Sequence, residues 1–275
     1  MFLYYSMTSL SIPSRTKEFG WKQDYGFDKW EEGPYGEYRW SKKGAGYTQT
    51  IEKPFVIIPV IASHPDLEKN PLDVKVFFSE DPFKKGQPLE EFKIRENKWM
   101  MRAYYFPQYL GKDIFFSFKV SRTWNPLKTL GLPDPRNLGI GVAKAHFRDE
   151  IGEEGIGFYG WEDIRKFPFR WTSDRAMMEF NTNKDEILIP VSAGNPDVKE
   201  RPVLVKIKVI RDQESVKSNI RLEDNLWHEV RINLGEKVLW KKFVIHFEVS
   251  RTWRPIDFGI GEDRRELGIK VGKIE

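Results

Sequence analysis

The chain has 275 residues, of which 40% are hydrophobic and 31% are charged, a composition typical of folded, water-soluble domains. Its 45 basic and 41 acidic residues leave a net charge of +4 and are interspersed along the sequence, which counts against nucleic acid as a partner. The absence of cysteine excludes disulfides, thiolate metal sites and cysteine nucleophiles.

The first residues carry no positive charge before their apolar stretch and contain no apolar run of seven residues. They therefore lack the charged and apolar regions of a secretory signal peptide. No run of 18 apolar residues occurs anywhere in the sequence. We therefore expect a cytoplasmic protein without a membrane span. The lack of thiols and the abundance of Lys, Glu and Arg fit a thermophilic source.

Short runs rich in Val, Ile, Phe and Tyr, broken by Pro, Gly, Asn and Asp, predict β-strands along the whole chain. The predicted strands lie at residues 55–62, 72–78, 99–106, 114–120, 138–147, 176–181, 186–193, 203–211, 226–234 and 243–249. Two of them alternate strictly: Ile114, Phe116 and Phe118 share one face, as do Ile245 and Phe247. No segment sustains an apolar period of 3.6, so the predicted class is all-β.

One unit occurs twice in this sequence. Residues 118–142 match residues 247–271 at 13 of 25 positions, with a constant offset of 129 and no gap. Upstream the offset is 131, so that Gly-Phe-x-x-Trp-Glu at residues 26–31 recurs at residues 157–162. A unit of roughly 120 residues with seven or eight strands is typical of a β-sandwich of immunoglobulin or jelly-roll size. We therefore predict two tandem antiparallel β-sandwich domains.

The duplication also sets the predicted domain boundaries. We expect an N-terminal extension at residues 1–20, a first repeat at residues 21–147, a linker at residues 148–156 and a second repeat at residues 157–275. Each repeat is long enough to bury a core of its own.

Aromatic residues gather near the start of each repeat, and the glycines and prolines around them place several on loops. Such rings can stack on the C–H faces of a pyranose, while arginine and carboxylate groups hydrogen-bond its hydroxyls. The alternative is that the tryptophans fill the core, which we favour for aromatics that both copies share. The candidate carbohydrate-binding residues are Trp30, Glu31, Arg39 and Trp40 in the first copy and Trp161, Glu162, Arg170 and Trp171 in the second.

A second repeated motif reads Ser-Arg-Thr-Trp-x-Pro and then Asp-x-Arg-x-Leu-Gly-Ile, and it predicts a strand end, a loop and a final strand. The aspartate and arginine can fix the loop by bonding backbone groups or each other, and we favour this structural role. The alternative places them at the mouth of a ligand groove. The residues concerned are Trp124, Asp134 and Arg136, repeated as Trp253, Asp263 and Arg265.

Other patterns in the sequence offer little chemistry. Glu31 and Glu162 could pair with Asp134 or Asp263 as the acid and base of a glycosidase. Carboxylates on loops, however, are more often solvated or bound to arginine. Gly155-x-Gly157-x-x-Gly160 matches the dinucleotide fingerprint, yet no hydrophobic strand precedes it and no amphipathic helix follows. The four histidines lack ligand spacing. We expect no metal site, no cofactor and no catalytic residue.

The combination of Gly-Phe-x-x-Trp-Glu, Arg-Trp-Ser/Thr, a proline-centred strand pair and the terminal motif resembles a β-sandwich module found as an accessory to bacterial glycosyltransferases and methyltransferases of surface-polysaccharide assembly. The resemblance covers both copies, hence most of residues 21–275, and implies a place beside glycan chemistry. No transferase accompanies the two modules in this chain, which favours binding over catalysis.

We therefore expect a non-catalytic protein that presents two similar sites to a polysaccharide or a lipid-linked oligosaccharide, with a glycosyltransferase as a further partner. Two weak sites on one chain gain avidity on a repeating polymer. The first alternative is an interaction scaffold without sugar affinity, which docks glycosyltransferases or associates with itself. The second is a polysaccharide-active enzyme.

Overall fold

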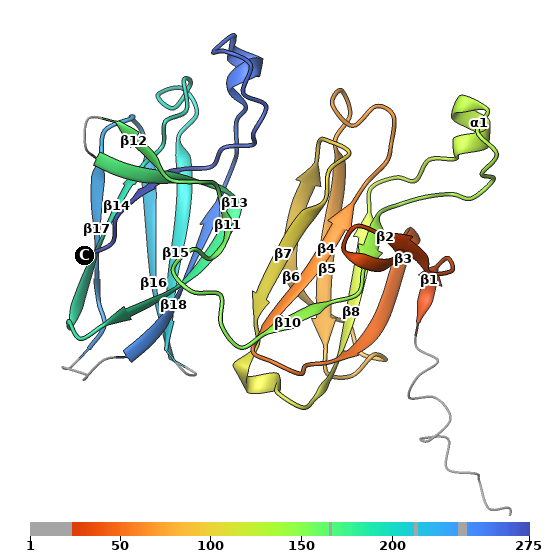
Figure 1. Ribbon diagram of the computed structural model, residues 1–275, viewed down its shortest axis with the longest axis horizontal. Helices are drawn as coiled ribbons and strands as arrows, with labels where there is room; N and C mark the ends of the chain where they lie inside the picture. Colours follow the sequence, from red (N-terminus) through yellow and green to blue (C-terminus); the bar gives the residue numbers. More distant parts are fainter. Residues whose placement is uncertain (1–23, 165–166, 212–213, 236–240) are drawn as a thin grey trace, which may run out of the picture. The chain divides into compact units, whose positions relative to one another are not determined.

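The computed structural model describes residues 24–164, 167–211, 214–235 and 241–275, so the predicted extension at residues 1–20 lies outside the described residues. Strands make up 55% of the structure and helices 5%. The strands form two antiparallel sheets, each of which curls around its own core (Figure 1). This confirms the all-β class and the two tandem β-sandwich domains.

In the described part of the chain, the first sheet has ten strands in the order β10-β4-β9-β3-β8-β5-β6, with β1 and β2 on β3 and β7 on β4. Their bounds are β1 Tyr25–Phe27, β2 Glu31–Gly33, β3 Gly36–Thr50, β4 Phe55–Ile61, β5 Leu72–Ser79, β6 Gln87–Ile94, β7 Met100–Tyr105, β8 Asp113–Val120, β9 Gly141–Ala143 and β10 His146–Arg148. Ile114, Phe116 and Phe118 of β8 are buried, as their alternation predicted.

Nine strands of the described residues form the second sheet, in the order β16-β15-β18-β13-β19-β14-β17, with β11 and β12 on β13. Their bounds are β11 Ile156–Phe158, β12 Glu162–Ile164, β13 Phe167–Thr182, β14 Glu186–Ser192, β15 Val203–Arg211, β16 Glu214–Leu222, β17 His228–Asn233, β18 Lys241–Val249 and β19 Lys270–Gly272. Ile245 and Phe247 of β18 are fully buried in the core of this sheet.

The two sheets share one topology. Strands β3 to β9 pair in the same pattern as β13 to β19, and β1 and β2 pair with β3 as β11 and β12 pair with β13. The repeat in the sequence is therefore also a repeat of strand order.

The longest strand of each repeat turns from one side of the curled sheet to the other. In the second repeat, residues 169–171 of β13 pair with β19, while residues 175–182 pair with β18. At the bend between them, the Ser173 hydroxyl donates to the carbonyl of Arg175 at 2.7 Å. The bend brings side chains from both ends of β13 together at one end of the domain, where the candidate site lies.

Strand positions differ from the prediction in the long central strands as well as at the edges. No strand was predicted over β3, and only residues 176–181 of β13 were predicted. Residues 138–147 form two short strands, β9 and β10, instead of one. The sequence pattern also missed β6 and β16, whose residues are largely exposed and polar because they lie at the outer edges of the sheets. Their cross-strand pairing, not an apolar alternation, makes them strands.

The terminal motif forms a projecting loop in each repeat. In the first it carries the short helix α1, Pro126–Leu130, capped by the Asn125 side chain and ended by Gly131 in the left-handed conformation. In the second it carries the 3-10 turn η2, Pro255–Phe258; a further 3-10 turn, η1, spans Pro107–Tyr109. Short antiparallel bridges, Trp124 with Leu138 and Trp253 with Leu267, close the two loops.

Candidate functional site

A buried arginine packed against aromatic rings is the centre of the site in the second repeat. The Arg170 side chain comes from β13 and is 2% exposed. Its guanidinium carbon lies 3.7 Å from the ring centre of Phe158 and 5.0 Å from that of Trp161. Its two terminal nitrogens donate to the main-chain carbonyls of Glu153 and Glu154, each at 2.8 Å.

Trp161 is 47% exposed and lies in the loop between β11 and β12. One side of the ring therefore faces the guanidinium and much of the rest faces solvent. Cation–π contact of this kind holds a ring in a fixed orientation. The arrangement offers an aromatic platform that is positioned before any ligand arrives.

A pocket of about 400 Å³ lies beside this platform. Its lining combines both ends of β13 with the C-terminal end of the chain, because the bend in β13 brings them together. The lining residues are Glu153, Trp161, Pro168, Arg170, Met178, Phe180, Gly272, Lys273 and Ile274. A mostly apolar pocket with a few polar groups and a volume in this range is typical of small-ligand sites.

The first repeat has the equivalent arginine cluster. The Arg39 guanidinium lies 4.2 Å from the ring centre of Phe27 and 4.4 Å from that of Trp30. Trp30 is 41% exposed and lies in the loop between β1 and β2. Arg39 also donates to Asp24 at 2.6 Å. Tyr47 stands beside this cluster, and burial raises the pKa of its hydroxyl.

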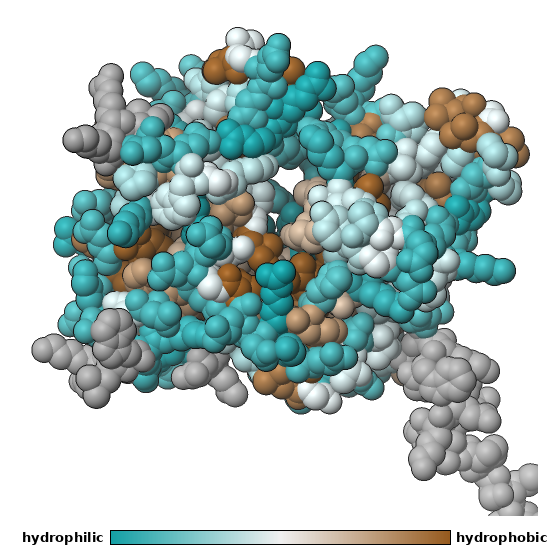
Figure 2. All heavy atoms as spheres, in the orientation of Figure 1, coloured by the Kyte–Doolittle hydropathy of each residue, from teal (hydrophilic) through white to brown (hydrophobic). Residues whose placement is uncertain are grey.

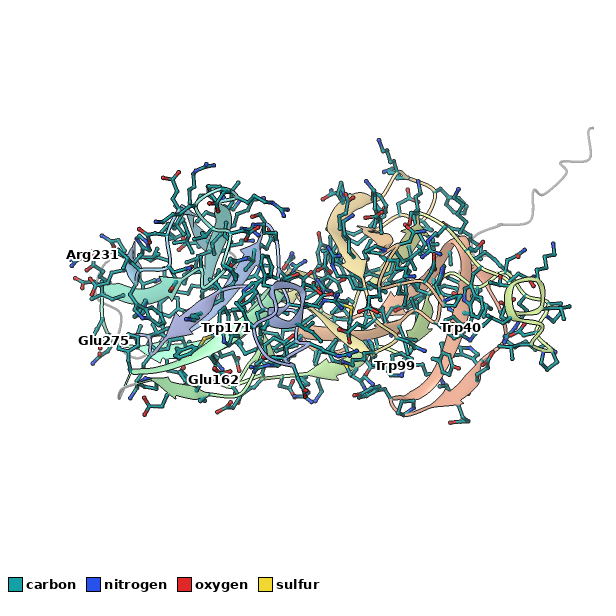
Figure 3. All side chains as sticks on the ribbon, turned by 90° about the horizontal axis from the view of Figure 1, so that it is seen from above. Trp40, Trp99, Glu162, Trp171, Arg231 and Glu275 are labelled. Atoms are coloured by element: carbon teal, nitrogen blue, oxygen red, sulfur yellow. The ribbon has the colours of Figure 1, made fainter. Side chains whose placement is uncertain are left out.

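The other two candidate tryptophans are buried. Trp40 is 7% exposed and Trp171 is 6% exposed (Figure 3). Trp40 packs edge-on against Tyr38, and Trp171 packs edge-on against Trp253 of the terminal motif. Neither ring offers a face on which a sugar can stack, so the exposed platforms are Trp30 and Trp161.

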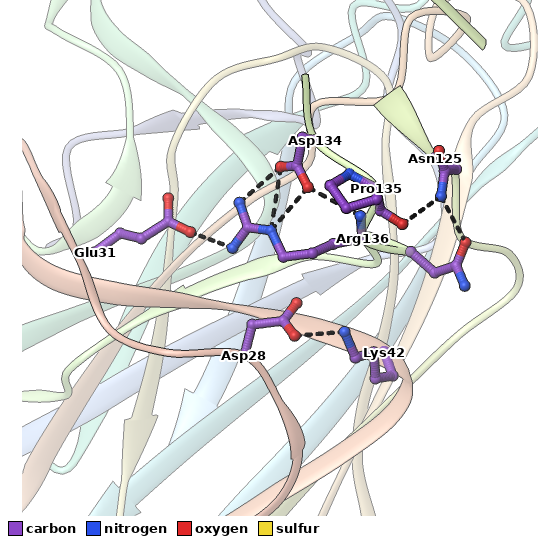
Figure 4. A network of polar contacts seen from close by, with 8 residues as sticks. Asp28, Glu31, Lys42, Asn125, Asp134, Pro135 and Arg136 are labelled. Atoms are coloured by element: carbon purple, nitrogen blue, oxygen red, sulfur yellow. Dashed lines mark hydrogen bonds and ion pairs between the residues drawn. The ribbon is translucent and has the colours of Figure 1, made fainter. Parts of the chain in front are cut away.

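The candidate glutamates join the two repeated motifs to each other. The Arg136 side chain donates three hydrogen bonds of 2.7 to 3.1 Å to Asp134 and a further one to Glu31 (Figure 4). The main-chain amide of Arg136 also donates to Asp134 at 2.9 Å. Both kinds of contact that the sequence suggested for the loop, to backbone and between side chains, are therefore present.

The second repeat reproduces this network. Arg265 donates to Asp263 at 2.7 Å and to Glu162 at 2.9 Å. The hydrogen bonds from the arginines hold the pKa of Asp134 and of Asp263 below the usual range. Because Glu31 and Glu162 begin β2 and β12, the network fixes the strand that directly follows each exposed tryptophan.

The glycines that mimic a dinucleotide fingerprint serve strand pairing. Gly155 and Gly157 have φ of 66° and 82°. A Cβ at Gly157 would lie 2.1 Å from the carbonyl oxygen of Arg175, and one at Gly155 would lie 2.2 Å from that of Met177. Only glycine permits so close an approach of this segment to β13.

The described residues contain neither a metal-binding cluster nor a membrane-crossing helix. In the described ranges, no group of three or more His, Cys, Asp or Glu side chains is arranged to hold a metal ion. None of the helices in the part of the chain that the structure describes is long and apolar enough to cross a membrane.

Sequence reasoning found the arginine and the exposed tryptophan of each repeat but missed most of the pocket. Met178, Phe180, Lys273 and Ile274 carry no motif, and only the bend of β13 and the path of the C-terminal segment bring them to Trp161. The signal that could have found Met178 is its register: it lies 131 residues after Tyr47, which packs at the equivalent arginine.

No protein family model matches the chain, and no curated protein does. Among solved structures, the tandem CBM22-1-CBM22-2 domains of Xyn10C from Paenibacillus barcinonensis share 10% identity and a TM-score of 0.24, over 86% of this chain and 85% of that one. The plant receptor-like kinase FER shares 10% identity and a TM-score of 0.23, over 89% and 84%. The ANX2 ectodomain from Arabidopsis thaliana shares 9% identity and a TM-score of 0.23, over 88% and 84%. Similarity at this level assigns no function to this chain.

Proposed function

We propose that this protein is a non-catalytic glycan-binding protein with related sites on its two repeats. The observation that carries the proposal is the pocket of about 400 Å³ beside the half-exposed Trp161, which the buried Arg170 holds in place. An indole ring of this kind presents an apolar face to the C–H groups of a sugar ring. Backbone and charged groups at the rim can then bond its hydroxyls.

The first repeat presents Trp30 in the same way, on the equivalent loop and against the equivalent arginine. Two related sites suit a polymer with repeating units, since engagement of one raises the effective concentration at the other. The resemblance to modules of surface-polysaccharide assembly supports a bacterial polysaccharide or its lipid-linked precursor as the ligand, and a cytoplasmic glycosyltransferase as a partner.

A glycan array that includes bacterial surface polysaccharides tests this proposal. The wild-type chain should bind one glycan class reproducibly, and the double variant Trp30→Ala/Trp161→Ala should lose that binding while keeping its circular dichroism spectrum. Trp227→Ala is the matched control, because Trp227 is 39% exposed but lies outside the pocket lining. A folded wild-type protein that binds no glycan would contradict the proposal, as would a double variant that binds normally.

The exposed leucines of the α1 loop favour a second candidate function, a scaffold that docks another protein. Leu127, Leu130 and Leu132 are 49%, 54% and 47% exposed. Figure 2 shows apolar atoms gathered at this loop. Clustered exposed apolar groups mark interaction surfaces more often than single ones do. Light scattering would reveal a stable oligomer or complex, and replacing the three leucines with serine should abolish it if the loop is the docking surface.

A further inference from the structure

The pocket of the second repeat contains a buried cation that forms no direct ion pair among the described residues. Arg170 bonds main-chain carbonyls and the sulfur of Met178, and no carboxylate in the described part of the chain forms an ion pair with it. Its Nε–H is buried and has no hydrogen-bond acceptor among the described residues. Lys273 lines the same pocket, is exposed, and also forms no ion pair within the described ranges.

The first repeat shows how a counter-ion can be supplied internally. Arg39, the equivalent of Arg170, is paired with Asp24 at 2.6 Å. The offset of 131 that relates the two arginines (170 − 39) places Gly155 at the position of Asp24 (24 + 131). Both copies have the arginine, but only the first has a carboxylate at this position, which pairs with the arginine directly.

A buried charge is costly unless an opposite charge or hydrogen bonds compensate it. Burial lowers the pKa of Arg170 to about 10, which reflects this cost. An anionic group that entered the pocket would supply the charge that Asp24 supplies in the first repeat. Lys273 would add a second attraction at the exposed side, and water is largely excluded from the guanidinium, which strengthens its field.

Glu153 is the acidic side chain of the pocket lining, and together with the neighbouring Glu154, whose charge also acts on Arg170, it opposes this attraction. The Glu153 side chain is exposed, and the main-chain carbonyl of this residue accepts a hydrogen bond from Arg170. The exposed carboxylates act through solvent, so their repulsion is weaker than the pull of the two cations, of which one is buried.

We propose that the second repeat selects an acidic sugar, a uronic acid whose carboxylate enters the pocket between Lys273 and Arg170. The first repeat, whose arginine is already neutralised, binds without this preference. The proposal rests on the glycan-binding function above and adds the class of sugar and a difference between the two sites.

The test compares glycans that contain galacturonic, glucuronic or mannuronic acid with their carboxyl-reduced forms, which keep the sugar backbone but lose the charge. The full-length chain should bind at least one acidic form about tenfold or more tightly than its reduced form. That preference should weaken in high salt and disappear in Trp161→Ala, while Trp30→Ala should keep it.

Substitutions of single charged residues test the contribution of each charge while leaving the buried Arg170 in place. Lys273→Met should weaken binding of the acidic glycan about threefold to fivefold and leave the reduced glycan unaffected. Glu153→Gln should strengthen acidic binding by a similar factor. Lys206→Met is the matched control, because this exposed lysine of β15 lies outside the pocket and should change neither affinity.

The outcomes separate this inference from the proposed function. If acidic and reduced glycans bind equally, or if only neutral glycans bind, the selection of an acidic sugar is wrong and glycan binding stands. If no glycan binds the folded chain, both proposals fall. If the preference resides in Trp30 instead of Trp161, the assignment to the second repeat is wrong.

Discussion

The arginine at the centre of each repeat has a structural duty as well as a proposed functional one. Arg170 closes one end of the second sandwich, where its guanidinium satisfies two main-chain carbonyls and packs against Phe158. Hydrogen bonds to a charged group contribute about 1.5–3 kcal/mol each. The side chain should therefore matter for stability even without a ligand.

We predict that Arg170→Met lowers the free energy of unfolding by about 2–3 kcal/mol, because two carbonyls lose their donor and the cation–π contact is lost. Urea unfolding of the full chain, fitted with one transition for each repeat, measures the change. Arg231→Met on the exposed surface of β17 is the control and should cost less than about 0.5 kcal/mol. Equal effects of the two substitutions would show that Arg170 does not hold the domain end together.

The Asp134 and Asp263 carboxylates predict a dependence of stability on acid. Their pKa values lie below the usual 3.8 because Arg136 and Arg265 hydrogen-bond the ionised forms. The stabilisation is therefore complete above about pH 4 and is lost as the pH falls through the lowered folded pKa. The double variant Asp134→Asn/Asp263→Asn should unfold at a lower temperature at pH 7 and lose less stability below pH 4. Thermal melts between pH 7 and pH 2 measure both slopes, and identical slopes would contradict this assignment.

At the scale of elements, each terminal motif is attached to its long strand by a glycine that allows close contact. The Gly139 amide donates to the carbonyl of Ser41 at 2.7 Å, and the Gly268 amide donates to that of Thr172 at 2.7 Å. A Cβ at Gly139 would lie 2.6 Å from the Ser41 hydroxyl, and one at Gly268 would lie 2.3 Å from the Ser173 carbonyl. These contacts leave no room for a side chain.

We predict that Gly139→Ala or Gly268→Ala lowers the free energy of unfolding by more than about 2 kcal/mol, since the strand or the loop must shift. Gly44→Ala in β3 is the control, because no atom lies within 4 Å of its added Cβ and its φ is ordinary. The control should be neutral or slightly stabilising. Chemical denaturation of the three variants provides the comparison, and a mild effect at Gly139 and Gly268 would mean that the loop is not tied to the strand.

The sequence predicted elements well where burial creates a pattern. The alternating strands at residues 114–120 and 243–249 lie almost where the structure has β8 and β18, because one face of each packs in a core. Edge strands such as β16 bury only one end of one face, so the alternation is too short for periodicity to reveal them. The candidate site divides in the same way. Trp161 and Arg170 lie in a repeated motif, whereas Phe180 and Lys273 reach the pocket only through the bend of β13 and long-range pairing.

At the scale of the whole molecule, two related sites on one chain predict avidity. Trp30→Ala alone should weaken binding to a long polysaccharide by tenfold or more, because the second site then binds without help from the first. The same substitution should leave unchanged the affinity of the second-repeat site, which contains Trp161, for a short oligosaccharide. Surface-immobilised polymer and free oligosaccharide, measured side by side, give the two affinities. Equal losses for both ligands would mean that the repeats do not act together.

NMR tests the glycan site at Trp30 and Trp161 directly, by following the indole N–H signals of the ten tryptophans while a glycan found on the array is added. Single Trp→Ala variants assign the signals of Trp30, Trp161 and Trp227. We predict that the signals of Trp161 and Trp30 both shift, while the signal of Trp227 stays in place. Shifts confined to other tryptophans, or none at a saturating concentration, would contradict the assignment of a glycan site to these two rings.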